Sequence, residues 1–132
     1  MIYWFPSKAD LMAGVALPHF EAEAETAIAA VRDAGAPAEA ARRVVAALSD
    51  FYLSDLDRFR LMYVAPQSGR RAAPRVAEAV TQRLHPVTGR MYGAIETALG
   101  GGPEARETAV ALHMAALGAG LLAAVTDAMG DL

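Results

Sequence analysis

Cysteine is absent from the 132-residue sequence, and lysine is nearly so. The lack of cysteine excludes a disulfide framework, a thiolate metal site and a cysteine nucleophile, and it suits a reducing compartment. Lys8 is the single lysine, and eleven arginines are scattered among fifteen carboxylates, which gives a net charge of -3. This balance is unlike the basic surface of a general nucleic-acid-binding protein. We therefore expect a cytoplasmic protein that does not bind nucleic acid through its overall charge.

Strand patterns and the signature of disorder are missing as well. No window of five or more residues shows the alternating β-branched and aromatic pattern of a strand. Roughly a quarter of the residues are alanine, the best helix former, and hydrophobic residues make up 55% of the chain against 20% charged. The sequence therefore predicts one folded all-α domain, an antiparallel bundle of four to six helices of which two are kinked.

Proline, glycine and capping residues divide the chain into four long helical segments. The first is predicted over about residues 7–34, with a bend at Pro18 that allows either one kinked helix or two helices. A continuous stripe of apolar residues predicts a second helix over about 38–64. A third helix over about 74–99 has a kink at its middle, and a last helix covers about 103–129.

Segment 109–125 is the most apolar part of the chain. It holds seventeen residues interrupted by His113, which is shorter than the roughly 20 apolar residues of a membrane span. We expect no membrane insertion and instead a helix that is buried on both sides, because a surface helix this apolar would leave one face in water. Small residues at four-residue spacing let two backbones approach closely. The predicted homodimer interface consists of Ala116, Leu117, Gly120, Leu121, Ala124 and Val125.

Motifs for catalysis and for metal binding are also absent. No serine lies in a Gly-x-Ser-x-Gly motif, no glycine-rich phosphate loop precedes a helix, and no glutamate stands three residues before a histidine. We expect neither an enzyme nor a bound metal or cofactor. An all-α enzyme would require charged residues that converge inside a pocket, which helical periodicity does not reveal.

Aromatic, methionine and histidine side chains are the candidates for a ligand pocket. Methionine repacks around varied apolar ligands, a histidine within the apolar last helix can contact a ligand, and a kinked third helix can open a cavity. Each of these side chains can equally be an ordinary member of the core. The predicted ligand-binding residues are Met12, Tyr52, Phe59, Met62, Tyr63, His85, Met91, Tyr92 and His113.

Residues 2–11, Ile-Tyr-Trp-Phe-Pro-Ser-Lys-Ala-Asp-Leu, resemble a junction in tetracycline-repressor-like (TetR family) transcription regulators. In that family, an aromatic pair followed by Phe-Pro-Ser-Lys-x-x-Leu links the recognition helix to the first helix of the ligand domain. The resemblance implies a regulator whose N-terminal helix-turn-helix reads operator DNA and whose C-terminal bundle binds a small molecule and dimerises. It also implies that Tyr3 and Lys8 match positions that contact backbone phosphate.

Four residues precede Phe5, whereas the family has three DNA-reading helices before this point. The resemblance therefore implies that residues 1–6 are the end of a recognition helix and that residues 7–132 form a single ligand-binding and dimerisation domain. We expect such a domain to bind a small apolar or amphipathic effector and to contact DNA only where a full-length protein supplies the missing helix-turn-helix. The effector would favour one angle of the helix bent at Pro18. The alternative is a stand-alone small-molecule or lipid-binding helical module.

Overall fold

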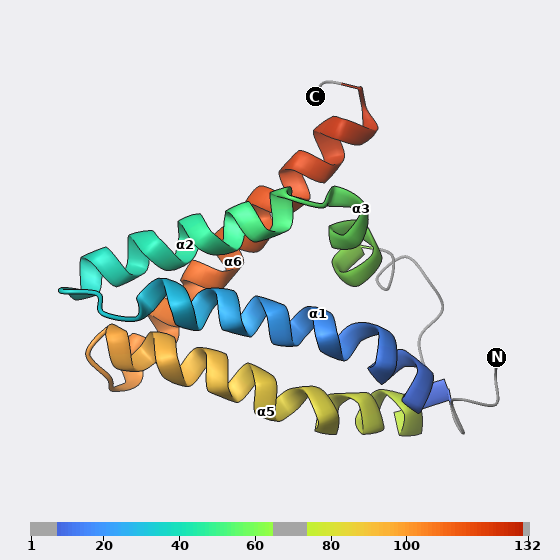
Figure 1. Ribbon diagram of the computed structural model, residues 1–132, viewed down its shortest axis with the longest axis horizontal. Coiled ribbons are helices and arrows are strands. Elements are labelled where there is room, and N and C mark those ends of the chain that lie inside the picture. Colours follow the sequence, from blue (N-terminus) through green and yellow to red (C-terminus); the bar gives the residue numbers. More distant parts are fainter. Residues whose placement is uncertain (1–7, 65–73, 131–132) are drawn as a thin grey trace.

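The computed structural model describes residues 8–64 and 74–130, with side chains described for 14–64 and 78–130. Within these residues the chain forms α1 (Lys8–Val31), α2 (Pro37–Leu53), α3 (Leu56–Phe59), the π-helical segment η2 (Arg60–Val64), α5 (Pro74–Ala98) and α6 (Pro103–Ala128) (Figure 1). This described part of the chain contains no strand. The predicted all-α class is confirmed.

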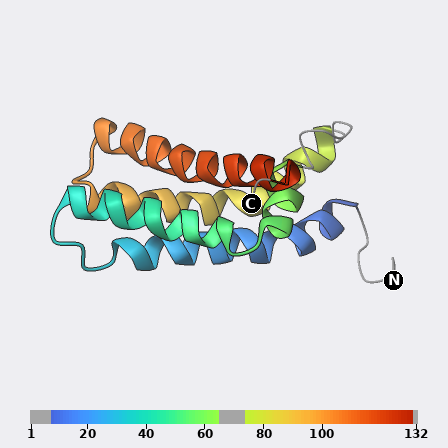
Figure 2. The same ribbon diagram turned by 90° about the horizontal axis from the view of Figure 1, so that it is seen from above.

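The long helices alternate in direction along the chain. α1 packs against α5 on one side and α2 on the other, and α2 packs against α6. The α1–α2 turn and the α5–α6 turn meet at one end of the bundle in both views (Figure 1, Figure 2). Toward the opposite end, the C-terminal half of α6 rises away from α1 and α5, with α3 close to α2 and α6 (Figure 1).

The turn between α5 and α6 follows from local backbone chemistry. Gly100, Gly101 and Gly102 have φ values of 103°, 75° and 89°, in the left-handed region that residues with a side chain rarely adopt. Pro103 then stands in the first turn of α6, where the missing proline N–H breaks no helical hydrogen bond. These four residues end one helix and start the next within a short turn.

Two helices contain an internal proline. Pro18 lies inside α1 and Pro86 lies inside α5, and both helices continue through the proline. A proline cannot donate to the carbonyl four residues earlier, so each helix gives up one hydrogen bond at this point. The bent first segment is therefore one helix rather than two.

The predicted second helix over 38–64 is wrong in one respect, because the structure breaks it after Leu53. The backbone N–H of Arg58 donates to the carboxylate of Asp55 over 3.0 Å, which starts α3 with a helix cap. The π-helical segment η2 follows directly. The apolar stripe concealed this break because Tyr52, Leu56 and Phe59 keep a helical spacing across it.

Arg60 attaches η2 to the far end of α6. Its guanidinium forms an ion pair with Asp127 and another with Asp57 at 3.2 Å, and it donates to the carbonyl of Ala124 over 3.2 Å. A cation at the C-terminal end of a helix also interacts favourably with the helix dipole. The short segments after α2 are thereby held against α6.

Small residues of α6 are buried against the rest of the chain, whereas most of its large apolar residues are exposed to solvent. Ala105, Ala109, Ala116, Gly120 and Ala124 are buried, whereas the exposed large residues of the helix and its C-terminal cap are Val110, Met114, Leu121, Leu122, Val125 and Met129. The expectation that this helix is buried on both sides therefore does not hold within one chain. One face is covered and the opposite face is open.

Candidate functional site

A buried carboxylate lies at the centre of the bundle. Glu23, near the middle of α1, is only 4% exposed. Its Oε2 atom accepts hydrogen bonds from the hydroxyls of Tyr52 and Tyr63, the latter over 2.6 Å, and lies 3.4 Å from Nε2 of His113. A buried charge is tolerated only when it is paired or hydrogen-bonded in this way. α1, α2, η2 and α6 thus converge on one oxygen atom.

His113 connects this carboxylate to Tyr92 on α5. Its Nε2 lies 3.1 Å from the hydroxyl oxygen of Tyr52, and its Nδ1 lies 2.5 Å from the hydroxyl oxygen of Tyr92. Because the Tyr52 hydroxyl donates to Glu23, its oxygen faces Nε2 as an acceptor, and we assign the ring hydrogen to Nε2. In this tautomer Nδ1 carries no hydrogen and is an acceptor, so Tyr92 donates to His113.

His19 forms the other edge of the cluster. It lies one helical turn before Glu23 on α1, and its Nε2 is 2.8 Å from the hydroxyl oxygen of Tyr63. Its Nδ1 is buried without a hydrogen-bond partner among the described residues. The rings of Phe20 and Phe51 pack against this imidazole at centroid distances of 5.1 and 5.4 Å. His19 therefore sits in a mainly aromatic environment.

The environment of Glu23 favours its charged form. Burial alone would raise the pKa of this carboxyl, but hydrogen bonds from His113, Tyr52 and Tyr63 outweigh the burial and hold the pKa below its ordinary value. For His19, burial is the largest effect and lowers the pKa of the imidazole; Glu23 opposes this shift and Arg58 adds to it. The cluster therefore favours an anionic Glu23 beside a neutral His19.

The tyrosines of the cluster keep their protons. Burial, followed by the charge of Glu23, raises the pKa of Tyr52, Tyr63 and Tyr92 above the ordinary value. A tyrosine nucleophile or general base would instead need a lowered pKa. The arrangement holds hydroxyls in fixed hydrogen-bonding roles and does not activate them.

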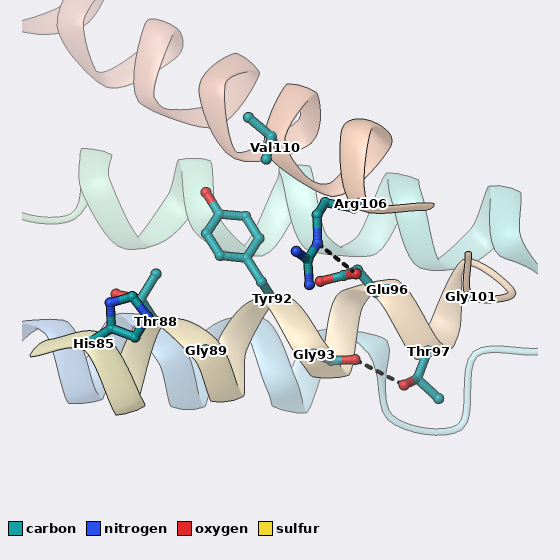
Figure 3. A pocket seen from close by; sticks show the side chains of 10 residues that line it. All are labelled: His85, Thr88, Gly89, Tyr92, Gly93, Glu96, Thr97, Gly101, Arg106 and Val110. Atoms are coloured by element: carbon teal, nitrogen blue, oxygen red, sulfur yellow. Dashed lines mark hydrogen bonds and ion pairs between the residues drawn. The ribbon is translucent and has the colours of Figure 1, made fainter. Parts of the chain in front are cut away.

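A cleft of about 570 Å³ lies between α5 and α6 (Figure 3). From α5 it is lined by His85, Thr88, Gly89, Tyr92, Gly93, Glu96 and Thr97, and from the turn and α6 by Gly101, Arg106 and Val110. Arg106 donates to Glu96 across the cleft over 3.2 Å. Tyr92 belongs both to this cleft and to the hydrogen-bond network around Glu23.

The structure places the predicted ligand-binding residues in the cleft, in the buried network or in the core, and Met12 lies outside the described side chains. His85 and Tyr92 line the cleft, and Tyr52, Tyr63 and His113 join Tyr92 in the buried network. Phe59 and Met91 are fully buried and Met62 is half-buried. The side chains of Met12 and Lys8 and all of Tyr3 lie outside the described residues. A binding role for these residues stays a prediction.

The predicted dimer interface is split between two faces of α6. Ala116, Gly120 and Ala124 are buried within their own chain, and a Cβ atom on Gly120 would lie 2.5 Å from Cε2 of Phe59. The small residues therefore make contacts inside the chain, and their part in a dimer stays a prediction. Leu121 and Val125 are exposed and Leu117 is half-buried.

Sequence reasoning missed Glu23, Glu96 and Arg106. Glu23 stands between Glu21 and Glu25 in a stretch that resembles a solvated helix face. One signal was available: residues 19, 23 and 27 recur every fourth position, which puts Glu23 on the same face as a small apolar alanine. The tyrosine partners come from positions 29 and 40 residues later in the chain.

Among the described residues, no group of three histidine, aspartate or glutamate side chains is placed to hold a metal ion. α6 is long and apolar enough to cross a membrane by length and composition, a property that core helices of soluble proteins share. No protein-family model, no curated protein and no solved structure matches this chain.

Proposed function

We propose that the chain is the effector-binding and homodimerising domain of a TetR-like transcription regulator. The resemblance of residues 2–11 to the family junction and the all-α bundle that follows support this proposal. The exposed face of α6 would pair two copies, and the cleft between α5 and α6 would hold a small amphipathic effector. Sequence-specific DNA binding would belong to a complete regulator with a helix-turn-helix.

The observation that carries the proposal is the open apolar face of α6. No charged residue occurs over 108–126, so this face carries no charge along about five turns of helix. Its exposed residues Val110, Met114, Leu121 and Val125 recur at three- or four-residue spacing around the half-buried Leu117. Contiguous apolar surface of this kind marks an interface, and a twofold axis would place the same face of a second copy against it.

The cleft and the dimer face share one helix. Val110 lines the cleft and also begins the exposed apolar face, and Arg106 lies one turn before it. An effector between α5 and α6 would therefore bias the position of the helix that pairs the subunits. α1 packs along α5, so the same shift would reach the helix that contains Pro18.

The proposal is tested by the mass of the chain in solution. Light scattering at micromolar concentration should give twice 13.9 kDa. Val125→Glu should give a monomer, because a carboxylate would be desolvated within the interface. Val15→Glu on α1 is the matched control, since Val15 is 53% exposed and Val125 is 47% exposed. This control should stay dimeric.

Two outcomes would contradict the proposal. A wild-type mass of 13.9 kDa across micromolar concentrations would exclude a stable dimer through α6. Equal loss of the dimer in both variants would place the interface elsewhere or indicate a general loss of structure. Circular dichroism of each variant distinguishes those two causes.

A stand-alone small-molecule or lipid-binding module is the second candidate. The cleft between α5 and α6 and the length and apolarity of α6 favour it, because neither feature requires DNA. Native mass spectrometry of the purified chain is the discriminating measurement. A bound phospholipid or fatty acid on a monomer would favour this module, and an unliganded dimer would favour the regulator domain.

A further inference from the structure

The two oppositely charged side chains that line the cleft differ in how far each is exposed to solvent. Tyr92 and Glu96 lie one turn apart on α5 and point toward α6, from which Arg106 reaches down to Glu96 (Figure 3). The Glu96 side chain is 18% exposed, whereas the Arg106 side chain is 76% exposed. Glu96 is therefore a largely buried part of the cleft wall, and Arg106 is an exposed residue at its rim.

The ion pair between these residues is easily exchanged. Ion pairs with an exposed partner contribute little to stability, because water stabilises the arginine nearly as well as the ion pair does. A ligand cation that reaches Glu96 would release Arg106 to solvent at small cost. The semi-buried carboxylate would then keep a positive partner, which it needs in a partly desolvated wall.

Tyr92 offers an acceptor to this cleft rather than a donor. With the ring hydrogen of His113 assigned to Nε2, the Tyr92 hydroxyl donates to Nδ1 at 2.5 Å, and the Nε2 hydrogen is directed to Tyr52 and Glu23. The Tyr92 oxygen keeps a lone pair for a second partner, which must donate. The negative charge of Glu23 also disfavours a second negative charge at Tyr92, and with burial it raises the pKa of the Tyr92 hydroxyl.

We propose that the cleft between α5 and α6 binds a small organic cation, an ammonium that carries an alkyl or aryl group. Its N–H groups donate to the carboxylate of Glu96, and its apolar part lies against the Tyr92 ring and Val110. The face of the Tyr92 ring adds a cation–π contact where the ammonium lies over it. This inference rests on the proposed function, since it names the class of effector.

Anions of the same size are disfavoured by the same geometry. To donate to an anion, Tyr92 would have to withdraw its hydrogen from His113 and leave Nδ1 without its partner. A buried acceptor that loses its only partner destabilises the folded state. An anion in the cleft would also be repelled by the largely buried carboxylate of Glu96 and would have to pair with the more exposed Arg106 at the rim.

The experiment compares three probes of equal shape, namely benzylammonium, benzyl alcohol and benzoate. Titrations of the full chain are followed by backbone and histidine-ring NMR at constant pH. Benzylammonium should bind saturably, shift the amides of Tyr92, Glu96 and Arg106, and shift the His113 ring nitrogens through Tyr92. Benzyl alcohol should bind more weakly, and benzoate should not bind.

Two charge variants should have opposite effects. Glu96→Gln should weaken benzylammonium binding about tenfold or more, the loss expected for one charge-assisted hydrogen bond. Arg106→Gln should strengthen it about two- to fivefold, because the competing cation is removed. An anion site would show the reverse signs with benzoate. Both positions lie at the cleft rather than in the apolar core, and circular dichroism checks that both variants fold.

Tyr92→Phe separates binding from coupling to the core. It keeps the ring but removes the hydroxyl that contacts His113, so benzylammonium should bind with little change in affinity and should no longer shift the His113 ring nitrogens. Saturable benzoate binding, unchanged affinity in Glu96→Gln, or no saturable binding of benzylammonium at millimolar concentration would each overturn the inference. The mass measurement tests dimerisation separately, so a monomer that binds benzylammonium would refute only the dimer.

Discussion

The two ends of the buried interior are held together by different interactions. Near the α1–α2 and α5–α6 turns, the interior is purely apolar and contains Val31, Val44, Leu48, Ile95 and Ala109. Further along the bundle, it contains the polar cluster of His19, Glu23, Tyr52, Tyr63 and His113. We call these regions the apolar end and the polar end.

The apolar end is stabilised by burial without direction, whereas the polar end depends on the geometry of each hydrogen bond. At the apolar end, the stabilising free energy scales with area removed from water and with close packing, and it has no direction. At the polar end, each group is stabilised only while its partner stands at the right distance and in the right protonation state. The polar end can therefore respond to a ligand or to pH, and the apolar end cannot.

Ile95→Ala should have the largest effect on stability. Ile95 is fully buried at the apolar end, so its truncation leaves a cavity and should lower the free energy of unfolding by about 2–5 kcal/mol. Chemical denaturation followed by circular dichroism measures the loss. Leu53→Ala is the control, because Leu53 is exposed and should change little. A smaller loss for Ile95→Ala than for Leu53→Ala would show that the apolar end is not the packed core.

Tyr52→Phe tests the polar end without changing its volume. The variant removes the hydroxyl that donates to Glu23 and accepts from His113. Loss of a hydrogen bond to a buried charge should lower the free energy of unfolding by about 1.5–3 kcal/mol. The same denaturation measurement checks this loss. An unchanged midpoint would mean that the hydrogen bonds orient the side chains but do not stabilise the fold.

Gly120→Ala should have a somewhat smaller effect, at the border of the polar end. A Cβ atom there would lie 2.5 Å from the Phe59 ring, which stacks against Tyr52 and Tyr63. The ring can shift in part, so we expect a loss of about 1–3 kcal/mol. Gly118→Ala on the same helix meets nothing within 4 Å and should stabilise the chain by up to about 1 kcal/mol. Equal effects of the two variants in thermal melts would contradict the close contact.

The sequence predicted the helices well because their ends depend on local residues. Pro37 and Pro103 start α2 and α6, and the glycines after α5 end it, as proline and glycine chemistry requires. The break at Asp55 was missed because the apolar spacing continues through it. An aspartate in a helical stretch caps a new helix only if the chain before it has turned, and periodicity does not record that turn.

The candidate site was predictable only in part. His85 and Tyr92 were expected beside a cavity, and both line the cleft. Glu23 was not expected, because its burial depends on residues that tertiary packing brings to it from other helices. The small residues of α6 were assigned to a dimer, yet the sequence cannot tell whether such residues approach another copy or Phe59 of their own chain.

Acid should weaken the polar end in two stages, and this is the smallest effect that the comparison predicts. The folded pKa of His19 lies below its ordinary value of 6.5, so the unfolded chain takes up that proton first, and stability should fall as the pH drops below about 6.5. The pKa of Glu23 is lowered from 4.5, so its contribution is present above that pH and is lost as the pH falls through the lower, folded value. Denaturation midpoints measured across this range check both stages. His19→Gln should abolish the first stage and keep the second, whereas a constant midpoint from about pH 7.5 to about pH 5.5 in the wild type would show that the His19 ring is solvated when charged.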